Sequence, residues 1–147
     1  MAFKDTTKKP FLEDRDVNVF IGLDYPLQLS TGTEGYFAST ATTIEAVKNN
    51  IRLLLSTDKG ERLMQPNLGS GLQRFLFEQF TDELRIMIEN EIVETFTFWM
   101  PFVELRDIQI SMSDNSTFGK NTMKVKINFN IRKDPNTLAS VVVDIGE

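Results

Sequence analysis

Apolar residues recur at helical spacing in two segments of the chain. In the first, Thr42 stands three residues before Glu45, which is the pattern of a capping box at the start of a helix. The apolar residues that follow fall on one helical face, so the pattern predicts a helix that ends between residues 56 and 60. The residues on this face are Ile44, Val47, Ile51, Leu54 and Leu55.

The second helical segment begins at Thr81, the expected N-cap, and is followed by Asp82 and Glu83 at the positive end of the helix dipole. Pro101 is expected to end this helix, because proline cannot continue the hydrogen-bond ladder. The predicted inner stripe carries two polar interruptions and consists of Leu84, Met87, Ile88, Glu91, Ile92, Thr95, Phe96 and Trp99.

After Pro101 the period changes from helical to alternating. Ile108, Ile110 and Met112 define one face of a strand, and residues 124–132 alternate strictly. We expect these two strands to form an antiparallel hairpin across a loop at residues 113–121. A turn at residues 134–136 then precedes a valine-rich strand at residues 138–145.

These elements predict an α+β fold, a single two-layer domain in which an antiparallel sheet of three to four strands packs against two main helices. The optional strand lies within residues 17–29, where Val17, Val19 and Ile21 alternate, and residues 30–40 are expected to be a loop. We divide the chain into an extended N-terminal arm at residues 1–16 and one domain at residues 17–147. The alternative interpretation of the arm is a frayed terminus.

Composition excludes several kinds of site. The chain has no Cys and no His, which rules out disulfides, Ser-His-Asp triads, Cys-His dyads and zinc fingers, and we expect no cofactor or metal. The net charge of −5 and the absence of a basic stripe argue against nucleic acid as a partner. No apolar run approaches the length that spans a bilayer, and the N-terminus lacks the apolar core of a secretory signal.

Residues 57–78 contain unusually dense turn signals between the two predicted helices. Gly60 follows the end of the first helix, and residues 66–69 are expected to form a turn. Ser70 is expected to cap a short apolar helix. That helix would carry Leu72, Phe75, Leu76 and Phe80. This block therefore predicts a compact surface shaped for packing and docking.

The same block resembles a known family. The matching positions are Lys59-Gly60-Glu61-Arg62, Pro66, Gly69, Leu72 and Leu76-Phe77-Glu78. They are similar to the baseplate wedge or sheath-initiator family of contractile tails, which includes gene product 25 and gene W type phage proteins and their type VI secretion counterparts. The resemblance extends over residues 17–145 and implies a structural protein of the virion, in the tail baseplate, that is assembled in the host cytoplasm.

The resemblance also implies partners: the tail sheath protein and other baseplate wedge and hub proteins. It implies that arms of sheath subunits add strands to an open sheet edge, with about six copies giving a multivalent advantage. We expect the final strand to supply this edge and its deletion to leave a folded domain. The predicted edge residues are Leu138, Ser140, Val141, Val142, Val143 and Ile145.

At one place the chain departs from the family pattern. The family carries a Glu-Pro-Arg tripeptide after the long helix, where this chain has Met100-Pro101-Phe102. An apolar contact can replace an ion pair at this corner, although Trp99 and Phe102 could instead belong to the core. Arg62 could bind a partner carboxylate, or pair with Glu61, Glu78 or a helix C-terminus of its own domain, which we favour. The candidates for wedge interaction are Arg62, Trp99, Met100, Pro101 and Phe102.

The alternative function is that of a lysozyme-like hydrolase that degrades peptidoglycan, because members of the family have been labelled in this way. Glycoside hydrolysis requires two carboxylates at a defined separation, one of them in an apolar pocket. Glu78, beside Phe77 and Phe80, together with Asp82 is the best pair that the sequence offers. A carboxylate at a helix end is more often solvated than catalytic, so we expect a structural protein rather than an enzyme.

Overall fold

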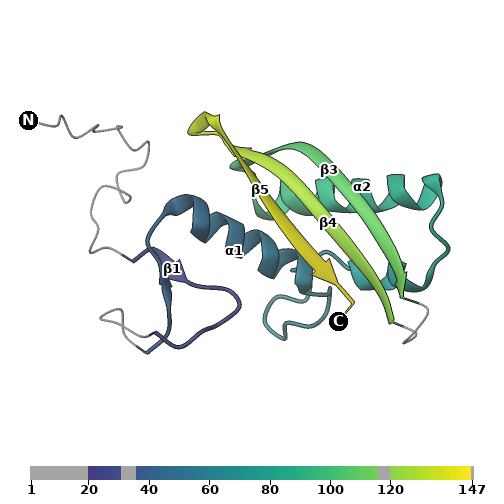
Figure 1. Ribbon diagram of the computed structural model, residues 1–147, viewed down its shortest axis with the longest axis horizontal. Helices are drawn as coiled ribbons and strands as arrows, with labels where there is room; N and C mark the ends of the chain where they lie inside the picture. Colours follow the sequence, from purple (N-terminus) through teal and green to yellow (C-terminus); the bar gives the residue numbers. More distant parts are fainter. Residues whose placement is uncertain (1–19, 31–35, 116–119, 147) are drawn as a thin grey trace, which may run out of the picture. The chain divides into compact units, whose positions relative to one another are not determined.

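The computed structural model describes residues 20–30, 36–115 and 120–146 (Figure 1). The chain forms two compact units, residues 1–49 and 50–147. The helix α1 (Thr43–Ser56) contributes residues to both units. The predicted arm at residues 1–16 lies outside the described residues, as do Val17 and Val19 of the predicted first strand.

The first unit contains two very short strands. Strand β1 (Gly22–Leu23) pairs antiparallel with β2 (Ser39–Thr40), and Leu29 forms an isolated bridge with Phe37. Among the described residues this segment pairs with β2 and adds no strand to the main sheet, so that sheet has three of the three to four strands expected. The prediction of a continuous loop at residues 30–40 is wrong at Ser39–Thr40, which form β2. Regular pairing stops after Leu23 because the chain bends and reaches Pro26, which has no backbone N–H.

The first helix begins as predicted. The backbone N–H of Glu45 donates a hydrogen bond to the Thr42 hydroxyl at 3.3 Å, which confirms one half of the capping box. The helix ends at Ser56, at the near limit of the predicted range. On its apolar face Ile44 is half-buried, and the other predicted members are buried: Val47, Ile51, Leu54 and Leu55.

The second unit continues with a short 3-10 helix, η2 (Leu72–Phe77), and the long helix α2 (Asp82–Trp99). The Thr81 hydroxyl accepts a hydrogen bond from the Leu84 N–H at 3.2 Å, which confirms the predicted N-cap. The helix ends at Trp99, just before Pro101, as expected. The buried residues of α2 are Leu84, Ile88, Ile92, Thr95 and Phe96.

Met87 was expected on the inner stripe of α2, but its side chain is exposed. The stripe is narrower than predicted because the buried positions follow the spacing of Leu84, Ile88 and Ile92, and Met87 lies to one side of that line.

Within the described residues, no helix combines the length and apolar character required to cross a membrane.

Three long strands form the main sheet, which confirms the α+β class. Strands β3 (Val103–Asn115), β4 (Lys120–Ile131) and β5 (Asp134–Ile145) are antiparallel in the order β3-β4-β5. Helix α2 contacts β3, η2 contacts β4, and Figure 1 shows α2 lying behind the sheet. The buried residues of the sheet include Val103, Ile110, Met123, Val125, Ile127, Phe129, Ile131, Ala139, Val141, Val143 and Ile145.

The strands are longer than predicted, and one turn is displaced. Strand β3 begins at Val103 rather than near Ile108, and the chain turns at residues 132–133 instead of at residues 134–136. Ile131 pairs directly with Asp134, and Pro135 lies inside β5 where the register with β4 shifts. Proline is tolerated here because β5 is an edge strand and the ladder is already irregular at this point.

Candidate assembly surfaces

Strand β5 lies at an edge of the main sheet, because β4 is the strand with which it pairs among the described residues. The register with β4 is regular from Ala139 to Ile145, so the backbone groups on the outer side of this stretch form a continuous row. Among the six predicted edge residues, Leu138, Ser140 and Val142 are exposed. The other three, Val141, Val143 and Ile145, are buried in the core of the chain itself. A partner could therefore meet these three only through their backbone.

The burial of β5 corrects one expectation. Deleting residues 138–147 would remove four buried side chains together with the pairing to β4. Such a truncation would expose the core residues that pack against these side chains, and it is not expected to leave a folded domain. The removed core residues are Ala139, Val141, Val143 and Ile145.

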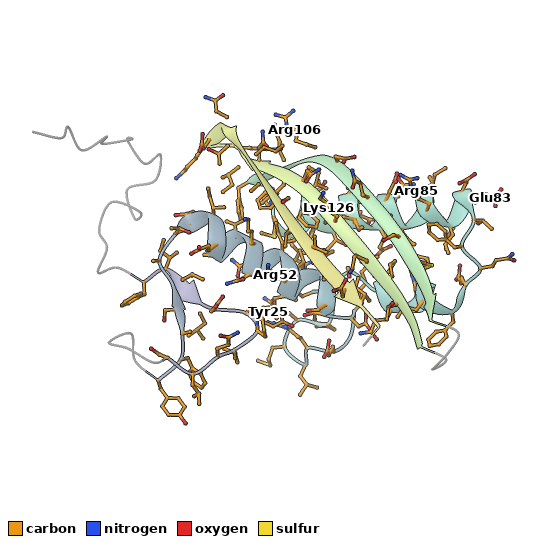
Figure 2. All side chains as sticks on the ribbon, in the orientation of Figure 1. Tyr25, Arg52, Glu83, Arg85, Arg106 and Lys126 are labelled. Atoms are coloured by element: carbon orange, nitrogen blue, oxygen red, sulfur yellow. The ribbon has the colours of Figure 1, made fainter. Side chains whose placement is uncertain are left out.

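The opposite edge, β3, carries more charged side chains, and they lie around its irregular point. Its pairing with β4 is interrupted by a bulge between Leu105 and Asp107. Glu104, Arg106 and Asp107 are exposed there, and Arg106 pairs with Glu104 at 3.0 Å. Figure 2 shows Arg106 at the end of the sheet near the turn between β4 and β5. Charges and bulges discourage strand addition, so β3 is the less receptive edge.

The block at residues 57–78 packs its backbone closely against the end of α1. A Cβ atom on Gly69 would lie 2.4 Å from the Thr57 carbonyl oxygen, and φ of Gly69 is +129°. The Ser70 hydroxyl donates a hydrogen bond to the Leu55 carbonyl at 2.9 Å, and the Ser70 N–H donates to the Thr57 carbonyl at 3.0 Å. Ser70 therefore ties the block to α1 instead of capping η2, whose N-cap is Gly71.

Two further details of the block differ from the predictions. The turn lies at residues 65–68, where the Leu68 N–H donates to the Gln65 carbonyl at 3.1 Å. Helix η2 ends at Phe77, so Phe80 lies beyond it and is partly exposed. Sequence reasoning placed Phe80 in the helix because its spacing from Leu76 suits an α-helix, whereas η2 has the tighter 3-10 geometry.

Charged residues join the block to α2. The carboxylate of Glu91 on α2 accepts from Lys59, and also from the Arg74 guanidinium at 2.9 Å. The Glu91 side chain is only 12% exposed, so these contacts account for the polar position in the apolar stripe. At the start of the block, burial raises the pKa of the Asp58 carboxyl, and the nearby charge of Glu61 raises this pKa further.

A groove of about 230 Å³ brings together four of the five predicted wedge-interaction residues. Arg62, Trp99, Met100 and Phe102 line it, with Asn50, Leu53, Leu54 and Leu68. Pro101 is not among the lining residues. Met100 is buried and forms part of the core, whereas Phe102 is partly exposed. The groove therefore combines an apolar surface with one cation.

The backbone at this corner is held in place on both sides of Phe102. The Val103 N–H donates to the Met100 carbonyl at 3.0 Å, and the Arg132 N–H donates to the Phe102 carbonyl at 3.0 Å. The guanidinium of Arg62 has no ion pair among the described residues, so the expected pairing with Glu61 or Glu78 is not met. The Glu61 carboxylate instead accepts from the Asp58 N–H at 3.1 Å.

Sequence reasoning missed three exposed apolar side chains, one on α2 and two in the loop that follows α1. Phe98 packs edge-to-face against Trp99, with ring centroids 4.9 Å apart. Adjacent helical residues point about 100° apart, so one of these two aromatic residues had to leave the inner face. Leu63 and Met64 are almost fully exposed at the tip of the loop that follows α1. The sequence feature that could have revealed Leu63 and Met64 is an adjacent apolar pair inside a polar, turn-rich segment.

The carboxylates considered for hydrolysis do not form a paired site. Glu78 lines a groove of about 520 Å³ with Phe77 and Phe80, but Glu78 is exposed. Asp82 is also exposed and is not among the residues that line this groove. A general acid requires an apolar enclosure that raises its pKa, and neither exposed carboxylate has one. The geometry therefore gives no support to glycoside hydrolysis.

The comparisons with known proteins agree with these features. The family model of baseplate wedge protein gp25 matches residues 41–136, which confirms the resemblance found in residues 57–78. A chain in the cryo-EM structure of the six-fold symmetrised anti-feeding prophage (AFP) baseplate is 29% identical, with a TM-score of 0.60. That alignment covers 78% of this chain and 86% of the AFP chain.

A second similar structure is the crystal structure of a Geobacter sulfurreducens protein that has been proposed to be a tail lysozyme. It is 27% identical with a TM-score of 0.57, and the alignment covers 71% of this chain and 91% of that protein. No curated protein matches the chain. The family match spans more than half of the sequence, so the chain belongs to the baseplate wedge protein gp25 family and is a structural protein of contractile-tail baseplates.

Proposed function

We propose that this chain starts the tail sheath by offering β5 to an arm of a sheath subunit, which adds a strand to the main sheet. The observation that carries the proposal is the contrast between the two sheet edges. The β5 edge pairs regularly from Ala139 to Ile145 and carries one acidic side chain in this stretch, Asp144, which pairs with Lys124 of β4. The β3 edge instead carries Glu104, Arg106 and Asp107 around its bulge. Strand addition requires an open row of backbone donors and acceptors, which β5 offers within the described residues.

The alternation along β5 fits this role. The buried side chains of Val141, Val143 and Ile145 hold the strand on its own core. The exposed side chains of Ser140 and Val142 lie on the open face, where side chains of an added strand would become their neighbours. With about six copies in a ring, each edge pairing would gain from the high effective concentration that earlier pairings create. The AFP baseplate, which contains a similar chain, is itself six-fold symmetrised.

We further propose that the groove beside Met100 joins the chain to a neighbouring wedge or hub protein. The surface offers Trp99 and Phe102 for apolar contact and Arg62 for a carboxylate. Aromatic residues and arginine are enriched in protein interfaces, and Met100 and Phe102 stand where the family pattern has charges. Assembly of this kind would take place in the host cytoplasm and end in the tail baseplate.

The sheath proposal is tested by adding one charge to each sheet edge. Val142 is 44% exposed and pairs with Lys126 of β4, which Figure 2 labels, so Val142→Glu adds a carboxylate beside a lysine. The new carboxylate blunts the edge, while the domain stays within about 0.5 kcal/mol of its original stability. We expect particles with this variant to contain the chain but to assemble little or no sheath, as counted by electron microscopy.

The matched control is Ser111→Glu on β3. Ser111 is exposed and pairs with Lys124 of β4, so the same charge is added to the opposite edge beside another lysine. This variant is expected to assemble normal sheath. Normal sheath on Val142→Glu particles would refute the proposal, and so would an equal loss in both variants.

A further inference from the structure

The loop between α1 and η2 presents two apolar side chains to solvent. Leu63 and Met64 are 97% and 95% exposed, the highest values among the large hydrophobic residues that the structure describes. Isolated exposed apolar residues are ordinary on protein surfaces. An adjacent pair at the apex of a turn is different, because neither side chain has a neighbour in its own domain that shields it from water.

The loop that carries this pair is closed by several hydrogen bonds. The Gln65 N–H donates to the Arg62 carbonyl at 3.2 Å, so Leu63 and Met64 are the central residues of a turn. The Gly60 N–H donates to the Pro66 carbonyl at 2.7 Å and closes the wider loop. The loop is therefore already ordered in the free chain. Binding a partner would cost less conformational entropy for this reason.

The base of the loop is attached to both neighbouring helices. Gly69 lies against the backbone of Thr57 at the end of α1, and Lys59 pairs with Glu91 of α2. These contacts use the charge of Lys59, and the Glu61 carboxylate accepts from the Asp58 N–H. Arg62 is the cation of the loop that remains available to a partner, since its guanidinium has no ion pair among the described residues, whereas Lys59 is paired.

We propose that Arg62, Leu63 and Met64, here called the docking tip, insert into an apolar pocket with a carboxylate at its rim on another baseplate protein. The proposal rests on the wedge or hub contact proposed for the groove beside Met100, with which the tip shares Arg62, and is independent of strand addition at β5. The apolar pair would fill the pocket, and Arg62 would pair with the rim carboxylate and fix the orientation. A protein pocket fits better than an anionic bilayer, because the chain carries a net charge of −5 and the tip has one cation.

The test replaces both apolar side chains by charges, in the variant Leu63→Asp/Met64→Asp. The side chains are almost fully exposed, so the urea midpoint of the purified chain is expected to remain unchanged. The variant is produced in cells that encode all other tail proteins but lack the wild-type chain. We expect purified particles to contain at least about tenfold less of this variant than of wild type, because charged residues would enter an apolar pocket.

The matched control is Gln65→Asp/Asn67→Asp. Both residues are exposed and lie in the same loop, so this variant adds the same charges without removing the apolar pair. We expect it to enter particles at the wild-type level. Normal incorporation of the Leu63→Asp/Met64→Asp variant would overturn the proposal. Equal loss of the control would also overturn it, because the added charge would then be the cause.

Two further measurements separate this proposal from its alternatives. Val142→Glu is expected to enter particles normally and to lose only the sheath, so failure of strand addition is recognised separately from failure of docking. Should the tip variant enter particles normally but assemble no sheath, docking into the baseplate would be excluded. Flotation of the wild-type chain with vesicles of phosphatidylcholine and phosphatidylglycerol, abolished in the tip variant, would assign the tip to a membrane and overturn the proposal.

Discussion

At the scale of single residues, Gly69 shows how the lack of a Cβ atom shapes the surface of the block at residues 57–78. Its Cβ would lie 2.4 Å from the Thr57 carbonyl oxygen and 2.8 Å from the Asp58 carbonyl carbon. Both atoms belong to the backbone, which cannot move aside as a flexible side chain can. The glycine was visible in the sequence, but the close approach that requires it was not.

Replacing this residue tests the requirement. Gly69→Ala is expected to reduce the free energy of unfolding by about 2–4 kcal/mol, because it adds a backbone clash to an unfavourable positive φ. Gly60→Ala is the control: φ of Gly60 is +93°, but a Cβ there meets nothing within 4 Å. Gly60→Ala is expected to reduce the free energy of unfolding by about 1–2 kcal/mol, from backbone strain alone. Urea unfolding of both variants measures the difference, and equal losses would contradict the proposed clash.

At the scale of elements, the helical pattern located α1 and α2 and their starts, because caps and amphipathic spacing act over a few neighbouring residues. It did not identify the partners of Glu91. Lys59 and Arg74 come from either side of a folded loop, so their meeting on one carboxylate depends on how that loop returns to α2. The same limitation explains Ser70, which local spacing assigned to η2 and the fold assigned to α1.

The role of Glu91 is testable within one helix. Glu91→Ala is expected to lower the free energy of unfolding by about 1–2 kcal/mol, because two charge-assisted hydrogen bonds to a shielded carboxylate are lost. Glu89→Ala is the control, since the Glu89 carboxylate pairs with Arg85 four residues away at an exposed position. Glu89→Ala is expected to lower the free energy of unfolding by about 0.5 kcal/mol or less. Similar losses in urea unfolding would show that the Glu91 contacts do not join the loop to α2.

At the scale of the whole molecule, the surfaces of the chain are better suited to assembly than to catalysis. The best candidate carboxylates, Glu78 and Asp82, are exposed and are not paired in one groove. The open β5 edge, the groove at Arg62 and the docking tip are all suited to contacts with other proteins. The similar Geobacter sulfurreducens protein has been proposed to be a tail lysozyme, so peptidoglycan hydrolysis by this chain is worth measuring.

We expect the purified chain to leave peptidoglycan intact in a turbidity assay, because Glu78 and Asp82, the best candidate pair, are both exposed. Glu78→Gln is expected to behave identically to wild type. A rate of clearing that is clearly above a heat-treated sample, and that Glu78→Gln abolishes, would establish a hydrolase and contradict the structural assignment. Hen egg-white lysozyme provides the positive control for the assay.

The sequence alone determined the α+β class, the helix starts at Thr42 and Thr81, the alternating strands and the family resemblance of residues 57–78, because these signals are local and periodic. Only the tertiary structure decided that Met100 belongs to the core, and that Leu63 and Met64 stand in solvent. Those properties depend on contacts between residues distant in the chain. A residue's spacing predicts its face on an element, but the packing of other elements decides whether that face is covered.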